Sequence, residues 1–313
     1  MTPMATPRID LTAAAMLLGL AAVWGGSFVF AEIALRELGP MTITLHRVGW
    51  AAPLLFVLIR LKRLALPRGW RIWGSYLVMG ALNNAIPFTL IFWGQTALEG
   101  GLASILNATT AVFGAVVAGL LLRDEPLLPR KLIGAALGVL GVAVVVGADA
   151  LGTLSLRNLA QLAVLAAALS YALASVWARV RLGDQPPLVN AFGMIAGSTV
   201  LMIPAALWSD GLPDLALAPV TWAALAGLSL LSTVLAYLLY FAILRRAGAA
   251  NLTLVTLLIP PFAIFLGWLV LGEALPASAW IGFAVIALGL LVTDGRAARA
   301  LAARYFLHTV TKE

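Results

Sequence analysis

The sequence predicts an all-α protein that crosses a membrane ten times. Three observations support this prediction: the composition, the length of the apolar runs and the distribution of basic residues between them. Of the 313 residues, 62% are hydrophobic and only 11% are charged, whereas a soluble domain carries about 25% charged residues. A soluble fold of this length could not bury so much apolar surface, so the composition excludes an ordinary soluble domain.

Apolar runs long enough for a spanning helix, about 20 residues, occur ten times. The first run is too long for a signal-peptide core and lacks a small-x-small cleavage site before Glu32, so we expect it to be retained as a helix. Helices are expected because the ten-residue alternating segments of outer-membrane barrels are absent. The predicted spans are 11–31, 41–60, 72–93, 99–122, 131–148, 158–180, 188–208, 218–243, 250–271 and 278–294.

Basic residues gather in alternate loops. All but three of the 20 Lys and Arg residues lie on one predicted side; Arg36 and Arg157 lie on the other side, and Arg47 lies inside the second span. The positive-inside rule therefore places both termini in the cytoplasm of a multi-pass protein of the cell (inner or plasma) membrane. The net charge of +7 then reflects topology and not a nucleic-acid partner. The basic tail is expected to lie on the anionic inner leaflet.

Two segments resemble each other: GLLLRDEPLLPRKLIGAALGVLG from Gly119 and GWLVLGEALPASAWIGFAVIALG from Gly267. The first joins spans four and five on the cytoplasmic side, and the second joins spans nine and ten on the outer side. The two halves therefore insert in opposite orientations, an arrangement typical of transporters whose site lies between the halves near the midplane. The alternative is a duplication kept for stability alone. The predicted organisation is a cytoplasmic N-terminus 1–10, a first repeat 11–148, an outer linker 149–157, a second repeat 158–294 and a tail 295–313.

Several motifs together resemble one known family. They are WGGSF at 24–28, Pro40 with Arg47, LRDEPLLPRKLIGAALGVLGV at 122–142 and LGEALPASAWIG at 271–282. Over about residues 11 to 294 the chain resembles the drug/metabolite transporter superfamily, specifically its EamA-type ten-helix exporters. The length and the aromatic content are similar to those of YddG-type amino-acid exporters. The resemblance implies an exporter whose central cavity is lined mainly by spans other than five and ten.

Polar side chains near the middle of the spans indicate the site. Asn83 and Asn84 lie in an uncharged run, where an unsatisfied amide is costly, so they must face other helices or a water-filled cavity. Adjacent helical residues point about 100° apart, so one can line a cavity while the other fastens a helix. Pro87 should free a backbone carbonyl near Asn83. The alternative for each residue is an interhelical hydrogen bond. The candidate substrate-binding residues are Trp24, Ser27, Asn83, Asn84, Phe88, Asn107, Tyr171, Ser232, Tyr237 and Pro260.

Charged residues inside the spans have two interpretations. Intramembrane charges usually pair, so Arg47 and Glu32 are expected to form a structural bridge, with His46 near it. Alternatively, Arg47 attracts a substrate carboxylate, or Glu32 or His46 carries a proton. Glu125 and Glu273 occupy equivalent places in the two similar segments and are expected to anchor loops.

Spans five and ten have no polar residue in their middles. The glycines Gly134, Gly138 and Gly141 have the small-xxx-small spacing that lets helices approach closely. We expect these spans to pack within the protein or across a homodimer, without contacting a ligand. The sequence leaves monomer and homodimer open.

The function expected is secondary export of small neutral or zwitterionic metabolites, most simply amino acids. The small multidrug members of the superfamily place a glutamate in the middle of span one. The corresponding segment of this chain, GLAAVWGGSF, has no acidic residue, which disfavours a cation/proton multidrug antiporter. Nucleotide-sugar or sugar-phosphate carriers are disfavoured because phosphates require buried Lys or Arg, and no such residue is expected at the midplane. An enzyme is disfavoured because no metal-ligand cluster, G-x-S-x-G turn or phosphate loop occurs, and a channel because no charge ring or filter occurs. With no Cys and only two His residues, no metal or cofactor is expected.

Overall fold

The structure is a computed structural model that describes residues 10–124, 128–146, 155–212 and 214–294, all of them in helices or in the turns between helices. The outer linker 149–157 lies largely outside the described residues, as do Glu125 and the basic tail. The helices are α1 Leu11–Ala34, α2 Pro40–Leu61, α3 Trp70–Gly80, η1 Ala81–Ala85, α4 Ile86–Gln95, α5 Gly100–Asn107, α6 Thr110–Leu121, α7 Pro129–Val146, α8 Leu156–Leu182, α9 Pro187–Ser209, α10 Pro219–Ala226, η3 Gly227–Leu235, α11 Ala236–Ala247, α12 Ala249–Leu252, α13 Val255–Leu271 and α14 Ala277–Asp294.

The membrane-spanning character of the fold is clear from helix length and composition. Eight helical segments among the described residues are long and apolar enough to cross a membrane, and two shorter apolar helices, Val255–Leu271 and Ala277–Thr293, follow them. The all-helical, multi-span class is therefore confirmed, whereas the count of ten spans stays a prediction. Many large apolar side chains are exposed on the outside of the bundle, as lipid contact requires.

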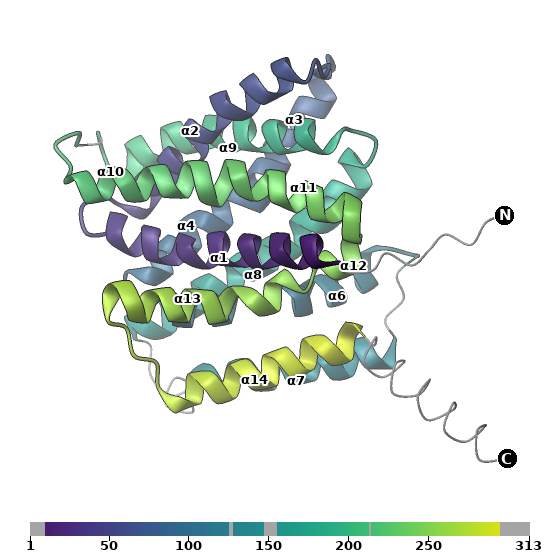
Figure 1. Cartoon of the computed structure of the whole chain (residues 1–313), viewed down its shortest axis with the longest axis vertical. Coiled ribbons are helices and arrows are strands. Elements are labelled where there is room, and N and C mark those ends of the chain that lie inside the picture. Colours follow the sequence, from purple (N-terminus) through teal and green to yellow (C-terminus); the bar gives the residue numbers. More distant parts are fainter. Residues whose placement is uncertain (1–9, 125–127, 147–154, 213, 295–313) are drawn as a thin grey trace, which may run out of the picture.

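Ion pairs at the two ends of the bundle show which helix ends lie together. At one end, Arg246 of α11 pairs with Asp10 before α1, with nitrogen and oxygen 2.6 Å apart. At the opposite end, Arg157 at the start of α8 pairs with Glu99 after α4, at 3.3 Å. Thus α1 and α8, which open the two predicted halves, begin at opposite ends of the bundle, as an inverted repeat requires (Figure 1).

Asp10 also caps α1, and its charge is stabilised there. Its carboxylate binds Arg246 and accepts the Ala13 N–H at 2.8 Å, which together hold the pKa of Asp10 below its usual value. A lowered folded-state pKa stabilises the fold above the unfolded pKa of about 3.9 and loses that effect as the pH falls through the folded value. We expect Arg246→Gln to raise the pKa of Asp10 in an NMR titration of labelled aspartate. An unchanged Asp10 titration would contradict the pairing.

Four interruptions occur at corresponding places in the two halves. The third span contains the π-helix η1, in which the Ile86 N–H donates to the Ala81 carbonyl five residues earlier. The eighth span contains η3, where the Ala236 N–H donates to Leu231 in the same way. The fourth span is divided between α5 and α6, and the ninth between α12 and α13. Because π-helical turns and helix breaks free backbone groups, these positions are where a binding site is most readily built.

The helices α7 and α14 pack closely along one side of the bundle (Figure 1). A Cβ added at Gly141 would lie 2.8 Å from the Gly282 carbonyl oxygen, and one added at Gly282 would lie 2.8 Å from the Gly141 carbonyl oxygen. A Cβ added at Gly134 would lie 2.5 Å from the Gly289 carbonyl oxygen, and one added at Gly138 would lie 2.8 Å from the Val112 side chain. The close approach predicted from the glycine spacing is therefore confirmed, and it occurs within one chain.

This packing predicts opposite effects at two glycines. Gly141→Ala forces the backbones of α7 and α14 apart and is expected to lower the free energy of unfolding by about 1–3 kcal/mol. Gly114→Ala in α6 has open space around the new methyl group and is expected to be neutral or stabilising by about 0.5–1 kcal/mol. Thermal unfolding in detergent measures both changes. Equal effects at the two positions would contradict the described α7–α14 contact.

Candidate functional site

A cavity of about 580 Å³ lies in the middle of the bundle, within the usual volume of small-molecule pockets. Both halves contribute to its wall, through α1, α2, the third span, α5, α6, α8, α9, the eighth span and α13. Its lining residues include none from α7 or α14, in agreement with the packing role of those two helices. Both π-helices supply polar lining residues: η1 contributes Asn83, and η3 contributes Ser232 and Thr233.

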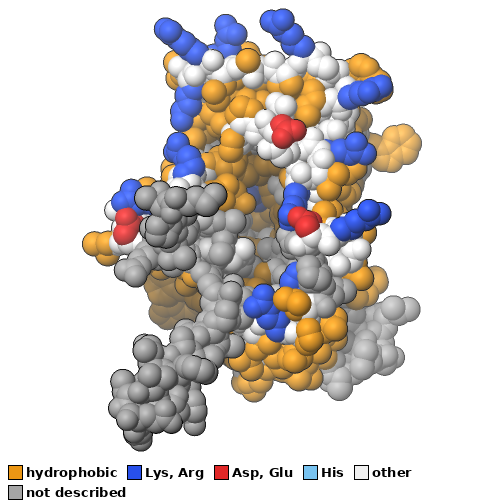
Figure 2. Space-filling view, turned by 90° about the vertical axis from the view of Figure 1, so that its right-hand side faces the viewer, with side chains coloured by type: hydrophobic (Ala, Val, Ile, Leu, Met, Phe, Trp, Pro, Cys, Tyr) orange, Lys and Arg blue, Asp and Glu red, His pale blue; other side chains and the backbone are white. Residues whose placement is uncertain are grey.

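The cavity opens at one end of the bundle. Its lining runs from Ser27 and Gln95, deep inside, to Arg179, Gln185 and Asn190 at the junction of α8 and α9. Figure 2 shows this face of the molecule hollowed in its middle, with Lys and Arg side chains around the hollow. The open end is therefore the basic end, and the end near Gln95 is closed.

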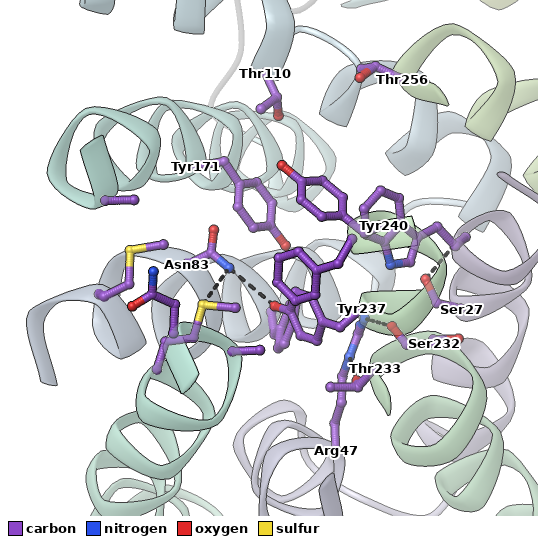
Figure 3. Close-up of a pocket in the computed structure, with 18 of the residues that line it drawn as sticks. Ser27, Arg47, Asn83, Thr110, Tyr171, Ser232, Thr233, Tyr237, Tyr240 and Thr256 are labelled. Atoms are coloured by element: carbon purple, nitrogen blue, oxygen red, sulfur yellow. Dashed lines mark hydrogen bonds between the residues drawn. The ribbon is translucent and has the colours of Figure 1, made fainter. Parts of the chain in front are cut away.

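Arg47 of α2 reaches the cavity from below in Figure 3 and is 6% exposed. Its Nε donates to the Thr233 hydroxyl at 3.2 Å, and its Nη2 donates to the Ser232 carbonyl at 3.2 Å. The guanidinium carbon lies 3.8 Å from the centre of the Phe88 ring. Within the described part of the chain Nη1 has no hydrogen-bond partner and no carboxylate pairs with the guanidinium. The site therefore contains a buried positive charge with donors left for a ligand.

Asn83 and two tyrosines form the polar wall opposite. The Asn83 amide nitrogen lies 3.4 Å from the Tyr237 hydroxyl and 3.6 Å from the Met194 sulfur (Figure 3). The Tyr171 and Tyr240 rings lie beside this pair and turn their hydroxyls toward the cavity. Ser170, next to Tyr171, donates to the Leu82 carbonyl at 2.7 Å and so binds α8 to the π-helix. The wall is therefore aromatic with a few fixed polar groups, as small-molecule sites usually are.

The structure brings eight of the ten candidate residues to the cavity. They are Trp24, Ser27, Asn83, Phe88, Asn107, Tyr171, Ser232 and Tyr237. Asn84 is fully buried behind the wall, where its amide nitrogen lies 3.5 Å from the Met194 carbonyl. Pro260 is also buried, and Thr256 and Ile259 of the same helix line the cavity in its place. The predicted division of the two asparagines, with one on the cavity and one on a neighbouring helix, matches this arrangement.

The expected Arg47–Glu32 bridge is wrong. Arg47 turns toward η3 and Phe88, whereas Glu32 lies beside Glu273 and Gln95 near the closed end. The position of a residue along its span predicts its depth in the membrane. It does not predict which neighbouring helix the side chain faces, and Arg47 and Glu32 face different helices. His46 does not line the cavity either; its ring contacts Trp50 and Trp222 edge-on, at 5.3 and 6.0 Å between centroids.

Several lining residues were not among the candidates, and Gln95, Phe92 and Tyr240 are examples. Gln95 ends α4 and looks from the sequence like a residue at the membrane edge, yet its side chain points inward. Its Nε2 donates to the Phe28 carbonyl at 2.9 Å. Tyr240 could have been predicted from the sequence, because it lies one helical turn after Tyr237 and therefore on the same face of the helix.

Glu273 anchors a loop as expected, although across the bundle and not beside its own helix. Its two carboxylate oxygens accept the backbone N–H groups of Gly100 and Gly101, at 3.0 and 3.2 Å, which are the first two residues of α5. A carboxylate at a helix N-terminus satisfies free donors and complements the helix dipole. This contact ties the segment after α13 to the start of α5.

Comparison with known proteins gives the family. The model of the EamA-like transporter family matches the chain twice, over residues 11–147 and 158–293. An uncharacterized transporter of Archaeoglobus fulgidus is 29% identical over 277 residues, which cover 88% of this chain and 94% of that protein. A protein of Streptantibioticus cattleyicolor named "Probable terminal-alkyne amino-acid exporter" is 27% identical, covering 87% of this chain and 90% of that protein. A solved crystal structure shares the fold, with a TM-score of 0.63 at 18% identity over 90% of this chain and 96% of that chain.

The matched family and the relatives indicate a transporter rather than an enzyme. They agree with the multi-span helical structure, which places the protein in the cell membrane. They also agree with a cavity built by both halves of the chain. Two copies of the family repeat, covering most of the sequence, show that the chain belongs to the EamA-like transporter family, within the drug/metabolite transporter superfamily.

Proposed function

We propose that this transporter is a secondary exporter of small zwitterionic metabolites, specifically neutral amino acids with aromatic or other apolar side chains. The observation that carries the proposal is Arg47, a buried guanidinium that lines the cavity and lacks a carboxylate partner among the described residues. A substrate carboxylate would supply the missing counter-charge through charge-assisted hydrogen bonds.

The rest of the wall suits the other parts of an amino acid. The Asn107 Oδ1 atom is buried and has no hydrogen-bond partner in the described structure, so it can accept a proton of an ammonium group. Trp24, Phe88 and Tyr240 offer aromatic surface for an apolar side chain. A relative named as an amino-acid exporter is consistent with this substrate class.

The charge of the cavity disfavours a second candidate, an exporter of cationic drugs. The charged residues that line the cavity are Arg47 and Arg179, and none of its described lining residues is acidic. Arg179 is paired with Asp124 at 2.5 Å, so a cation in the cavity would meet the unpaired charge of Arg47 with no acidic side chain among the described lining residues to stabilise it. Carriers of other anionic metabolites remain compatible with Arg47, and the substrate panel below separates them from amino-acid carriers.

Orientation and direction complete the proposal. The open end of the cavity is the basic end of the bundle, which the positive-inside rule places in the cytoplasm. With this orientation the open cavity would face the cytoplasm and take up substrate from there. Rocking of the two predicted repeats about the midplane cavity would expose the same site to the outside.

Efflux from proteoliposomes tests the substrate class. Vesicles are loaded with labelled phenylalanine, methionine, threonine, phenethylamine, a cationic dye or a nucleotide sugar, and release is compared with that from protein-free vesicles. We expect phenylalanine and methionine to leave faster than phenethylamine, which lacks the carboxylate. Selective release of the dye, of phenethylamine or of the nucleotide sugar would overturn the assignment.

A further inference from the structure

Three polar side chains from distant parts of the chain meet at the closed end of the cavity. They are Glu32 of α1, Gln95 at the end of α4 and Glu273 after α13. The Glu273 carboxylate oxygens accept the two N–H groups that begin α5, at 3.0 and 3.2 Å. Gln95 also lines the cavity, so this carboxyl pair lies beside the deep end of the cavity.

Two acceptor atoms in this group have no donor. The Oε2 atom of Glu32 is buried without a hydrogen-bond partner. The Gln95 side chain is 6% exposed, and its Nε2 bond to the Phe28 carbonyl fixes the orientation of the amide. Its Oε1 atom is therefore left buried and unpartnered as well. Unpaired buried acceptors are costly, so their presence together indicates that the site binds something that donates.

The charges around Glu32 indicate that the missing hydrogen-bond donor is a proton. The charged groups that face it are the carboxylates of Glu273 and Glu99, and Glu99 is already paired with Arg157 at 3.3 Å. Arg36, one turn along, is exposed, and no ion pair joins it to Glu32 in the described structure. Two carboxylates that share a site cannot both ionise without mutual repulsion. One proton removes the repulsion and turns Glu32 into a donor toward Glu273 or the Gln95 Oε1 atom.

From this geometry we infer that Glu32 and Glu273 share one proton and that the pair couples proton entry to substrate export. The inference rests on the proposed transport function. With the proton bound, the ends of α1, α5 and α13 can close over the cavity, as in this structure. When the proton leaves toward the cavity, the two carboxylates repel each other and favour opening of the closed end. Exchange of a proton for substrate requires two such states, one stabilised by the bound proton and the other stabilised by its loss.

The first experiment measures substrate movement with and without a pH gradient. In proteoliposomes loaded with labelled phenylalanine, acidification of the outside is expected to accelerate efflux by the wild type. Glu32→Gln keeps the size and the hydrogen-bonding capacity of a protonated carboxyl. This variant should lose the acceleration but retain exchange of labelled for unlabelled phenylalanine at equal pH. Glu99→Gln is the matched control, because Glu99 is paired with Arg157, and it should keep the acceleration.

Several outcomes would overturn the inference while leaving the transport function intact. They are exchange without any effect of the pH gradient in the wild type, full acceleration in Glu32→Gln, and a requirement for sodium in place of a gradient. A second readout does not need transport. Infrared spectra of purified protein should show a carboxylic-acid band at neutral pH that is absent from Glu32→Gln and present in Glu99→Gln.

The infrared band separates the two proposals. If the band is present but no amino acid moves, the proton site stands and the substrate assignment fails. If Glu32→Gln does not fold, the wild type alone still tests the inference. Its carboxylic-acid band should disappear as the pH is raised, over the same pH range in which the effect of the pH gradient on efflux is lost. A wild-type spectrum without a protonated carboxyl at neutral pH contradicts the inference.

Discussion

Arg47→Gln is expected to weaken strongly the binding of carboxylate-bearing substrates while leaving the protein folded. Hydrogen bonds to charged groups contribute about 1.5–3 kcal/mol each, so loss of one or two corresponds to a decrease in affinity on the order of 10-fold to more than 100-fold. Stability should change little, since the glutamine can keep a bond to Thr233 and the variant removes an uncompensated buried charge.

Two comparisons make the Arg47 prediction specific. Arg47→Lys keeps the charge but loses the planar, forked donor geometry, so partial binding is expected. Phenylalanine should raise the thermal unfolding temperature of the wild type, raise it less in Arg47→Lys and leave it unchanged in Arg47→Gln. Phenethylamine should produce no such difference between the three proteins. If Arg47→Gln unfolds readily and the folded fraction still binds phenylalanine, then Arg47 only supports η3 and the Phe88 ring.

The adjacent asparagines are expected to separate stability from transport. Asn84 is fully buried, where it accepts from the Tyr237 hydroxyl at 3.4 Å and donates to the Met194 carbonyl at 3.5 Å. Asn84→Ala removes both of these buried hydrogen bonds and should lower the free energy of unfolding by about 1–3 kcal/mol. Asn83 lines the cavity, so Asn83→Ala should weaken substrate binding with a smaller effect on stability.

Thermal unfolding and phenylalanine efflux, measured on both variants at equal reconstituted amounts, check this division. Asn83→Ala and Asn84→Ala serve as controls for each other because they remove the same group from neighbouring positions. The placement of the two side chains is contradicted if both variants lose stability equally, or if Asn84→Ala alone lowers the affinity for substrate without a change in unfolding temperature.

Local patterns in the sequence were enough for the class of fold and for the depth of the site. Hydropathy and the placement of Lys and Arg predicted a multi-span helical membrane protein because both depend only on residues close together in the chain. Amides such as Asn83 indicated a cavity because lipid cannot satisfy them. The irregular geometry near Pro87 was foreseen for a similar reason, since proline removes a backbone donor wherever it occurs. The matching π-helix η3 contains no proline and had no comparable signal.

The tertiary structure alone decided which side chains face each other. Depth along a helix suggested that Arg47 would meet Glu32, but the rotation of α2 turns Arg47 toward η3, while α1 turns Glu32 toward Glu273 and Gln95. Such contacts join helices far apart in the sequence, and a small change in helix rotation would exchange one partner for another. The sequence by itself therefore determined what kinds of groups lie in the membrane and at what depth. Only the packing of the helices, driven by close glycine contacts and the shape of the buried core, determined which of those groups form the cavity and which form the carboxyl pair beside it.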